Sequence, residues 1–539
     1  MASTAKQRVV ILGGGFGGVF TAKHLQRRAA GRSVHVELIS QNNFFVFQPL
    51  LPEVAGGNVH PLDAVCPLRQ FLPRTRIRVA DIRKVDLSAR IIHVTAGRDR
   101  AIAEIPYDHL VVALGQVVDL RRTPGLSERA LVMKDVADAF KIRNQILACL
   151  EEADEATDPR RKRRLLTFIV IGGGFTGVET VGEVQDLIRK TLRHYPRINP
   201  EDVRIVLVQH GARILPELPE HLADYATAAL RRRGVEILLK TGVKTVSAAG
   251  VETDGGGVLD AETIIAAIGN AASPLVESMQ VPLQKGRIVV DRFLRVGGFE
   301  NVWALGDNAL IPLRNGKHGV EDYAPPLAQF AFREAKVLAA NIQRSIAGQQ
   351  PAPFEYKSLG TMASLGGRLG VADILGVRVA GFPAWLAWKI LYLALLPGAA
   401  NRIRYAIDGL LNLMFTRGIA QVRPAGVASH PIHLLAGEMV LEPGFMPEGL
   451  YVVTSGALEL SDPESGEDVE GGSSRSLGPG DCFGLLPDGE APDAPQRVRA
   501  CEDATAYFIA RDDLQKLTMV AALLGRRAQT PAATEPESP

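Results

Sequence analysis

The sequence predicts an α/β fold with two Rossmann-like dinucleotide-binding domains, an amphipathic helical segment that lies on a membrane surface, and a C-terminal β jelly roll. Residues 9–20 (VVILGGGFGGVF) and 168–179 (FIVIGGGFTGVE) are near copies of one motif, an apolar strand followed by G-x-G-x-x-G and a helix. Residues 382–415 carry apolar residues at helical spacing, and glycines after residue 430 separate short alternating segments. With 539 residues, 46% of them hydrophobic and 22% charged, the chain is long enough for several domains.

The two glycine motifs are expected to bind the pyrophosphates of two dinucleotides. In each copy the first glycine permits a tight turn, the second lets the backbone approach the pyrophosphate, and the third lets the helix pack on the strand. The N-terminus of each helix then presents free N–H groups to the phosphates. The first copy consists of Gly13, Gly15 and Gly18, and the second of Gly172, Gly174 and Gly177.

The order of the remaining strands indicates that the second domain is inserted in the first. Residues 108–115 (DHLVVALG) return as a strand ending at Gly115, and residues 286–309 close with a strand and "GD". This layout is similar to that of two-dinucleotide flavoproteins, which implies that Asp307 contacts the ribityl chain of FAD. We therefore expect an FAD-binding domain formed by residues 1–120 and 286–355, and an NAD(P)H-binding domain formed by residues 121–285.

The cysteines indicate that electrons leave to an external acceptor. Cys66, Cys149, Cys482 and Cys501 are scattered, without the paired spacing of a disulfide redox centre or a metal site. We expect Cys66 and Cys149 to be buried, inert thiols, and no metal ion. The net charge of +2 gives no support to nucleic-acid binding.

The segment 356–425 is expected to lie on a membrane surface. It contains Trp385 and Trp388, with Tyr392 one turn further on, and a second helix that carries an apolar stripe beside arginines. Helices that are apolar on one side, with tryptophan and basic residues near the edges, are typical of membrane interfaces. An ordinary pair of packing or dimerisation helices stays open as the alternative. The stripe consists of Ile403, Ile407, Leu410, Leu411 and Met414, with Arg402 and Arg404 off it.

We expect a cytoplasmic protein that is peripheral on the inner face of the cell membrane. The N-terminus lacks the pattern of a signal peptide, and no apolar run is long enough for a transmembrane helix. A lipid-soluble electron acceptor, a quinone, is within reach of a flavoprotein in this position.

Residues 9–422 resemble a type II NADH dehydrogenase, a non-proton-pumping NADH:quinone oxidoreductase of respiratory chains. The resemblance rests on ordered motifs, namely NNFFVFQPLLPEVAGG, GGGFTGVETVGE, RILPELPEHL, VWALGDNA and PPLAQFAFREA, and on the tail at residues 384–415. It implies that Glu179 lies near the nicotinamide and quinone pockets, where it supplies protons or positions substrate. It also implies that Gln329 lies near the quinone ring.

Three positions depart from the pattern of that family. The acid that often holds the adenosine ribose of FAD is Ser40 here, and FAD binding is still expected. The equivalent acid of the nicotinamide domain is Gln209, with Arg213 close by, so the repulsion of a 2′-phosphate is lost and NADPH stays open beside NADH. Arg333 replaces a glutamine that often follows the "AQ" motif.

Residues 430–520 resemble a cyclic-nucleotide-binding domain. Leu485 takes the position of the glutamate that holds the ribose in active members, and the phosphate-binding position falls near Ala494, with Arg497 and Arg499 displaced. A buried phosphate without a partner costs several kcal/mol, so we expect a structural or docking module without tight nucleotide binding. Residues 521–539 are expected to be a disordered tail.

These expectations combine into one reaction. NAD(P)H reduces FAD, and reduced FAD reduces a membrane quinone, with membrane contact through residues 382–415. A soluble FAD-dependent reductase with a protein or other non-quinone acceptor, and a sensor without turnover, are the alternatives. A homodimer is one oligomeric state that stays open.

Overall fold

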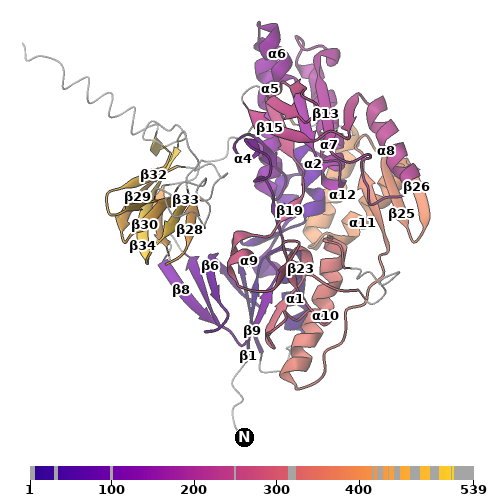
Figure 1. The fold of residues 1–539 in the computed structure, drawn as a ribbon. Coiled ribbons are helices and arrows are strands. Elements are labelled where there is room, and N and C mark those ends of the chain that lie inside the picture. The colour runs from indigo at the N-terminus through magenta and orange to yellow at the C-terminus, as the bar shows by residue number, and fades with distance from the viewer. Residues whose placement is uncertain are drawn as a thin grey trace, which may run out of the picture. The chain divides into compact units, whose positions relative to one another are not determined.

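The computed structural model shows an α/β chain with a β-rich C-terminal part (Figure 1). It forms two compact units, residues 1–94 with 104–422, and residues 95–103 with 423–539. The residues that the structure describes are 7–28, 34–96, 101–247, 250–313, 323–414, 418–421, 429–434, 436–441, 449–461, 474–485, 497–511 and 513–514.

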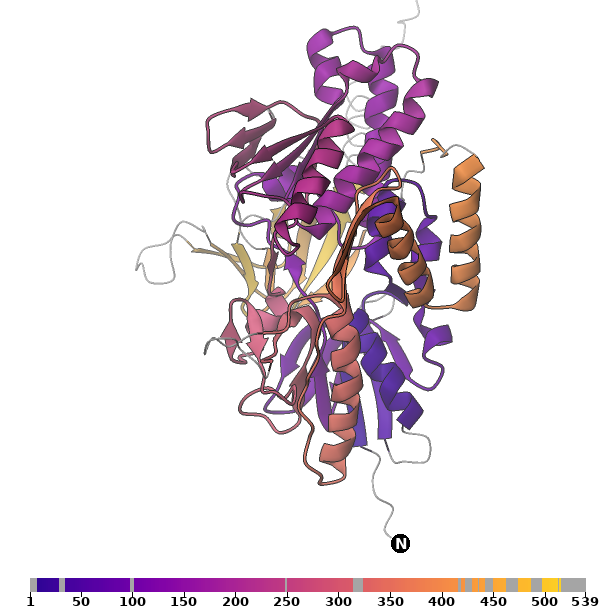
Figure 2. The same ribbon diagram turned by 90° about the vertical axis from the view of Figure 1, so that its right-hand side faces the viewer.

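A five-stranded parallel sheet forms around β1, in the order β22-β9-β1-β2-β5. The residues Val9, Val10, Ile11 and Leu12 of β1 are fully buried, as expected for the central strand of a parallel sheet covered on both faces. The strands are β1 (Gln7–Leu12), β2 (Val34–Ser40), β5 (Arg76–Val79), β9 (His109–Val112) and β22 (Val302–Ala304). Helices α1 (Phe16–Arg28) and α10 (Ala328–Ile346) pack against each other beside this sheet (Figure 2).

A second five-stranded parallel sheet has the order β11-β18-β12-β13-β14. Its strands are β11 (Leu131–Val132), β12 (Thr167–Ile171), β13 (Arg204–Gln209), β14 (Val235–Leu239) and β18 (Thr263–Ala266). Its helices are α5 (Val136–Glu155), α6 (Pro159–Leu165), α7 (Phe175–Thr191) and α8 (Glu220–Arg232). All of these elements fall in the chain between β9 and β22 of the first sheet, so the second sheet is an insertion in the first domain.

Several smaller sheets are separate from the two five-stranded sheets. They are the three-stranded sheet β6 (Asp81–Asp86), β7 (Ile91–Ala96) and β8 (Ala101–Pro106), the sheet β15 (Val243–Ser247), β16 (Gly250–Thr253) and β17 (Val258–Leu259), and the pair β3 (Phe44–Val46) and β4 (Val65–Pro67). The sheet β20 (Leu283–Gln284), β21 (Arg287–Val289) and β23 (Ala309–Leu310) and the short helix α2 (Leu51–Ala55) also belong to this part of the chain.

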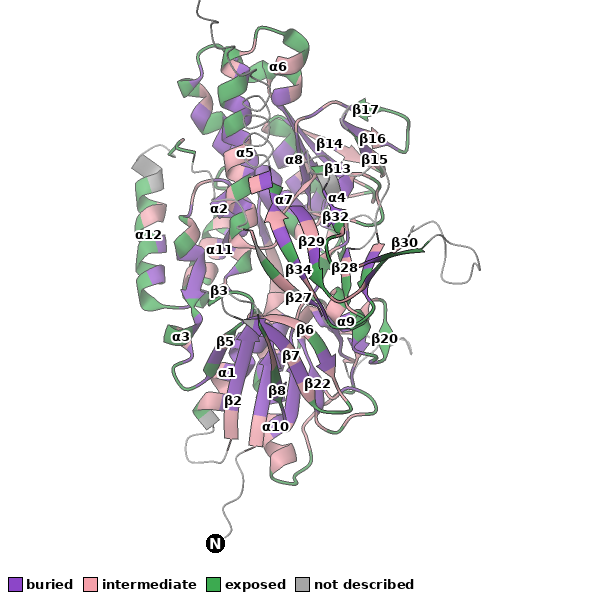
Figure 3. Cartoon of the chain, turned by 90° about the vertical axis from the view of Figure 1, so that its left-hand side faces the viewer, coloured by how far each residue is buried: buried purple, intermediate pink, exposed green. Residues whose placement is uncertain are grey.

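An antiparallel sheet leads into two further helices. It consists of β24 (Gly360–Ser364), β25 (Gly370–Ile374) and β26 (Val377–Gly381). Helix α11 (Phe382–Leu395) follows β26 directly, and α12 (Ala399–Met414) follows after a short turn. Exposed residues cover much of α12 (Figure 3). Among the described residues, no helix combines the length and the apolar character needed to cross a membrane.

The C-terminal unit contains two four-stranded antiparallel sheets, β27-β34-β29-β32 and β28-β33-β30-β31. Strand β34 alternates buried and more exposed residues, which is the pattern of a sheet with one face in a core. The strands are β27 (His430–Leu434), β28 (Met439–Leu441), β29 (Gly449–Ser455), β30 (Leu458–Ser461), β31 (Ser474–Leu477), β32 (Cys482–Gly484), β33 (Arg497–Ala500) and β34 (Ala504–Ala510). Ala494 and the tail 521–539 lie outside the described residues.

Candidate functional site

The first glycine loop connects β1 to α1. Gly13 has φ +108°, and a Cβ there would lie 2.2 Å from the Ala113 carbonyl oxygen, so only glycine fits. A Cβ on Gly18 would lie 2.0 Å from the Gly13 oxygen, which explains the third glycine of the motif. Space is open at Gly15, where no heavy atom lies within 4 Å of a Cβ. Backbone N–H groups at this turn can therefore approach a pyrophosphate closely.

Ser40 lies at the end of β2, next to this loop. Its side chain is buried, and its Oγ lies 2.3 Å from the position that a Cβ on Gly14 would take. The buried acid of the same strand, Glu37, instead accepts a hydrogen bond of 2.8 Å from Arg78 of β5. Ser40 is therefore the polar side chain of β2 that lies at the glycine loop.

Asp307 lies in the turn after β22, a strand of the same sheet as β1, which leads into the first glycine loop. Asn308 is fully buried and accepts a hydrogen bond of 3.0 Å from the Gly115 N–H, so the turns after β9 and β22 are tied together. Among the described residues, none donates a hydrogen bond to the Asp307 carboxylate. Burial raises the pKa of this carboxyl, while Lys134 and Arg287 act in the opposite direction. A half-buried carboxylate in need of donors fits the hydroxyls of a ribityl chain, so this region fits FAD.

Glu334 of α10 is hydrogen-bonded to the turn that contains Asp307. The sequence pattern did not identify it as a site residue. Its carboxylate is 1% exposed and accepts a hydrogen bond of 2.8 Å from the Gly306 N–H. Burial raises the pKa of Glu334 to about 7. The only sequence signal was a glutamate within the apolar start of a helix.

The second glycine loop repeats the geometry of the first. Gly172 has φ +110°, and a Cβ there would lie 2.2 Å from the Ala267 oxygen. A Cβ on Gly177 would lie 1.8 Å from the Gly172 oxygen, and the space at Gly174 is open. These positions match those of the first loop one by one, so the second loop fits a second dinucleotide, NAD(H).

Gln209 lies at the end of β13 and is bonded to this loop. Its Oε1 accepts a hydrogen bond of 2.9 Å from the Gly173 N–H, and its Nε2 donates one of 3.3 Å to the Arg213 carbonyl oxygen. A neutral amide thus occupies the place where an acid commonly binds the ribose 2′-OH. The guanidinium of Arg213 donates to the Pro216 carbonyl oxygen at 3.0 Å.

Glu179 points from α7 toward β24 and α11. Its Oε1 accepts hydrogen bonds from the Ser364 N–H at 3.0 Å and from the Trp388 indole N–H at 3.1 Å. The residue is 7% exposed, and burial raises its pKa to about 8, although both hydrogen bonds favour the charged form. At neutral pH this carboxyl therefore carries a proton that it can give up.

Gln329 lies at the start of α10, at the other end of β24. Its Nε2 donates to the Gly360 carbonyl oxygen at 3.1 Å, and its Oε1 accepts from the Tyr356 hydroxyl at 3.2 Å. Since Glu179 bonds to Ser364, the last residue of β24, and Gln329 bonds to Gly360, the first, one short strand contacts both residues. Arg333 stacks its guanidinium 4.3 Å from the Tyr356 ring centre.

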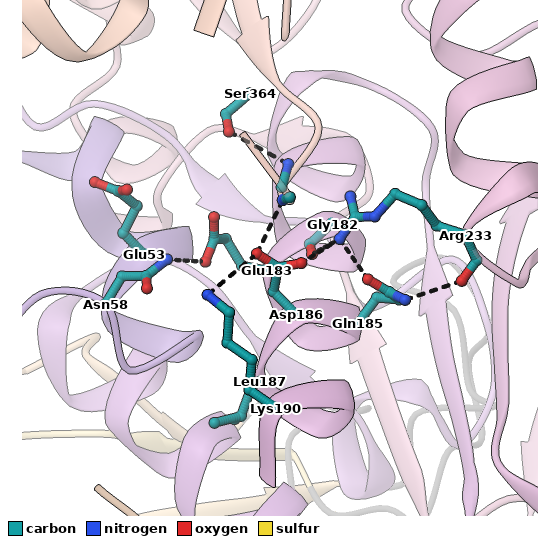
Figure 4. A network of polar contacts seen from close by, with 12 residues as sticks. Glu53, Asn58, Gly182, Glu183, Gln185, Asp186, Leu187, Lys190, Arg233 and Ser364 are labelled. Carbon is teal, nitrogen blue, oxygen red and sulfur yellow. Dashed lines mark hydrogen bonds and ion pairs between the residues drawn. The ribbon is translucent and has the colours of Figure 1, made fainter. Parts of the chain in front are cut away.

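An arginine clamp fixes the loop that follows β24 (Figure 4). Arg233, after α8, hydrogen-bonds to the Leu365 carbonyl oxygen, Gln185 and Asp186. Asp186 also accepts a hydrogen bond of 2.9 Å from the Gly367 N–H. The clamp ties α7 and α8 to the loop beside Ser364, which bonds to Glu179. Nothing in the local sequence indicated this set of contacts.

Two further buried carboxylates lie near Glu179 and were also missed. Glu183, one turn further along α7, accepts a hydrogen bond of 2.6 Å from Asn58 (Figure 4). Glu53 of α2 accepts one of 2.9 Å from the Tyr405 hydroxyl and pairs with Lys389. Both carboxylates are 2% exposed. The spacing of Glu179 and Glu183 on one helix face was the available signal.

The prediction that Trp388 lies near the edge of a membrane interface is wrong. Trp388 is 1% exposed, because its indole N–H bonds to Glu179 and its ring packs edge-on against Tyr392. The exposed large apolar side chains of α11 and α12 are mostly aliphatic, with one phenylalanine. They are Phe382, Leu386, Ile390, Leu391 and Leu395 on α11, and Ile403, Ile407, Leu410 and Leu411 on α12.

The four cysteines are free thiols. Cys66 and Cys149 are buried, as expected, and burial raises the pKa of both, that of Cys149 to about 11. Cys482 and Cys501 are exposed. Among the described residues, no cluster of three or more His, Cys, Asp or Glu side chains is arranged to bind a metal ion.

Comparison with known proteins agrees with this geometry. Residues 7–335 match the pyridine nucleotide-disulphide oxidoreductase family model, residues 358–418 match the NDH2 C-terminal domain, and residues 431–520 match the cyclic nucleotide-binding domain. A type II NADH:quinone oxidoreductase of Mycobacterium tuberculosis is 33% identical over 76% of this chain and 89% of its own length. One of Staphylococcus aureus is 30% identical over 72% of this chain and 94% of its own length.

The fold also matches solved structures. NDH2 from Plasmodium falciparum in complex with NADH has a TM-score of 0.71 and 23% identity, and the match covers 77% of this chain and all of that one. Two linked parallel sheets, each with a glycine-rich turn, define a two-dinucleotide oxidoreductase. The chain belongs to the pyridine nucleotide-disulphide oxidoreductase family and, within it, to the type II NADH:quinone oxidoreductases.

Proposed function

We propose that the protein oxidises NADH and reduces a membrane quinone, with FAD as the cofactor between them. The net reaction is NADH + H⁺ + quinone → NAD⁺ + quinol. FAD, when bound, accepts a hydride from the nicotinamide and returns two electrons to the acceptor. The observation that carries the proposal is that β24 contacts Glu179 at one end and Gln329 at the other, in a chain of the type II family.

The first glycine loop and the turns beside it would bind FAD. Backbone N–H groups at Gly13, Gly15 and Gly18 would contact the pyrophosphate, Ser40 the adenosine ribose, and Asp307 the ribityl hydroxyls. Gly115, tied to Asn308, would keep the backbone close to the isoalloxazine side of the site. The open space at Gly15 supports this arrangement.

The second loop would bind the nicotinamide dinucleotide through Gly172, Gly174 and Gly177. Gln209 would bind the ribose 2′-OH without the charge that repels a 2′-phosphate, so NADPH is a second donor. With these roles, residues 1–120 and 286–355 would form the FAD-binding domain, and residues 121–285 would form the NAD(P)H-binding domain.

Glu179 and Gln329 would act on the quinone. The Glu179 carboxyl, which carries a proton at neutral pH because burial raises its pKa, would supply a proton to the reduced quinone. The Gln329 amide would orient the quinone ring through a hydrogen bond. Trp388 and Ser364 keep the Glu179 side chain in one position.

Residues 382–415 would attach the enzyme to the inner face of the cell membrane. Ile403, Ile407 and Leu410 of α12 are 61%, 50% and 59% exposed, an apolar face without cover among the described residues. Such a face partitions into the interfacial region of a bilayer. The alternative is that the same apolar face forms the contact between two copies of the chain in a homodimer.

The C-terminal unit would be a jelly roll that serves as a structural or docking module. Leu485, which takes the position of the ribose-binding glutamate, is 1% exposed and packs with Leu450 and Leu514. A core side chain at this position cannot bind a ribose hydroxyl. The soluble reductase with a non-quinone acceptor is not favoured, because the matched relatives are named as quinone reductases.

Steady-state oxidation of NADH by the purified protein, with and without a short-chain quinone, tests the function. We expect quinone-dependent turnover by wild type. Gly15→Val should lose FAD and turnover, since the side chain fills the space of the pyrophosphate. The matched control is Gly255→Val, at a position that is equally open but lies in the β16–β17 turn. Turnover that is independent of quinone would contradict the proposal.

A further inference from the structure

The loop that follows β24 lies directly against helix α7. A Cβ on Gly182 of α7 would be 2.4 Å from the Leu365 carbonyl oxygen, and a Cβ on Gly366 would be 2.3 Å from the Gly182 carbonyl oxygen. Gly366 also has φ +70°, a conformation that side chains disfavour. Two glycines therefore allow the backbones of α7 and the loop to touch, and a small shift of the loop breaks this contact.

Arg233, which follows α8, binds both sides of the contact (Figure 4). On the loop side, its guanidinium donates to the Leu365 carbonyl oxygen. On the α7 side, it donates to Gln185 and Asp186, and the Gln185 amide donates to the Arg233 carbonyl oxygen at 2.9 Å. A guanidinium carries five N–H donors in a rigid plane, so this one side chain fixes the geometry between the loop and α7.

Asp186 adds a second link between α7 and the loop. One of its oxygens pairs with Arg233, and the other accepts a hydrogen bond of 2.9 Å from the Gly367 N–H. The side chains of Arg233 and Asp186 are 10% and 11% exposed, so this ion pair is largely shielded from solvent. Lys190 lies 3.9 Å from Asp186, in a more exposed position. Shielded, charge-assisted contacts are stronger than ion pairs on the surface.

The clamped loop begins at a residue that binds Glu179. The Ser364 N–H donates to the Glu179 carboxylate at 3.0 Å, and Leu365, the residue that Arg233 binds, is next along the chain. The position of the clamp therefore determines whether the Ser364 N–H reaches the carboxylate.

The charge state of Glu179 depends on the groups that face it. Glu53 of α2 and Glu183 of α7 raise its pKa, and Tyr392 of α11 also interacts with it. The Ser364 N–H and the Trp388 indole N–H act in the opposite direction, since both favour the carboxylate. Loss of the Ser364 bond should therefore raise the pKa of Glu179 further.

We infer that Arg233 is a positioning residue for quinone reduction, because it holds the loop after β24 on α7 and so keeps the Ser364 N–H on the Glu179 carboxylate. This role rests on the proposed function of Glu179. Arg233 acts through the loop, and its contribution is to keep the acid in one place while the quinone is reduced.

The test measures quinone-dependent kcat per bound FAD against pH in the full-length protein. It compares wild type with the double variant Arg233→Met, Asp186→Asn, which removes both charges and so leaves no buried charge unpaired. We expect kcat to fall by about tenfold, since a displaced group is a poorer acid. The midpoint of the alkaline decline should move to higher pH by about one unit, as expected when a carboxylate loses one donor. Flavin bleaching by NADH in a single turnover should stay within about twofold of wild type.

Gly366→Ala perturbs the same loop without changing the ion pair. Its Cβ would displace the loop from Gly182, so the midpoint should again move to higher pH. The matched control is Gly376→Ala, in the β25–β26 turn, where φ is +86° and no heavy atom lies within 4 Å of a Cβ. Arg232→Met is the control for Arg233, because Arg232 is exposed and bonds within α8. Both controls should keep the midpoint of wild type.

Different outcomes separate this role from the proposed function. Wild type without quinone-dependent turnover would overturn both, and turnover without an alkaline decline would overturn the role of Glu179 and that of Arg233 with it. An unchanged midpoint in the double variant and in Gly366→Ala would overturn the role of Arg233 alone. A midpoint at lower pH would do the same, since it would mean that water reaches Glu179 and relieves its burial. Equal losses in flavin bleaching and turnover would show general damage and also overturn it.

Discussion

If Glu179 protonates the quinone, turnover must fall as the pH rises through the pKa of this carboxyl. Burial raises that pKa from 4.5 to about 8, so the group is protonated at neutral pH and loses its proton on the alkaline side. With a pKa of about 8, the protonated fraction falls about tenfold between pH 7 and pH 9. We expect quinone-dependent kcat to fall by the same factor over this interval.

Two substitutions change this profile in different ways. Glu179→Gln removes the titrating group, so kcat should be lower and no longer fall across the alkaline range. Trp388→Phe removes an N–H that stabilises the carboxylate, so the pKa should rise and the midpoint should move to higher pH. Trp385→Phe, one turn earlier on α11, removes an indole without a bond to Glu179 and should leave the midpoint in place.

The assay is steady-state oxidation of NADH with a saturating short-chain quinone, at constant ionic strength across the pH range. Single-turnover bleaching of the flavin by NADH, measured over the same range, serves as the reference for a step that does not need Glu179. An alkaline decline that persists with the same midpoint in Glu179→Gln would refute the assignment of this group.

Four further results are expected. Gln209→Glu should restore a charge that repels the 2′-phosphate and reduce kcat/KM for NADPH relative to NADH by about tenfold, or about 1.4 kcal/mol; an unchanged ratio would contradict the role of Gln209. Asp307→Ala should weaken FAD binding, measured by flavin retained after gel filtration, whereas full retention would place the ribityl contact elsewhere. Ile403→Glu with Ile407→Glu should release the protein from lipid vesicles in a sedimentation assay with FAD still bound, and vesicle binding as in wild type would exclude α12 as the membrane contact. Calorimetric titration of the full-length protein with cyclic AMP or cyclic GMP should show no saturable binding at micromolar ligand, given the core position of Leu485.

Local features of the site could be predicted from the sequence because they depend on neighbouring residues. The two glycine loops are strand, turn and helix within about a dozen residues, and their positive φ values and close backbone contacts are properties of the motif itself. The aliphatic stripe of α12 follows from helical periodicity in the same way.

Contacts between distant parts of the chain could not be predicted in this way. Trp388 and Glu179 are 209 positions apart, and Lys389 and Glu53 are 336 apart. Tryptophan and lysine are typical of helices at a membrane interface, so the local sequence favoured that interpretation. The structure shows instead that Trp388 and Lys389 of α11 bind the buried carboxylates of Glu179 and Glu53. Glu183 was visible at helical spacing from Glu179, but its burial depends on those same distant contacts.

The most direct test of the central claim is anaerobic mixing of the FAD-loaded protein first with NADH and then with a short-chain quinone, followed through the flavin absorbance. The account predicts that one equivalent of NADH bleaches the flavin and that one equivalent of quinone restores the oxidised spectrum with formation of quinol. Bleaching by NADH without reoxidation by quinone would contradict quinone reduction. A flavin that NADH leaves oxidised would contradict the whole account.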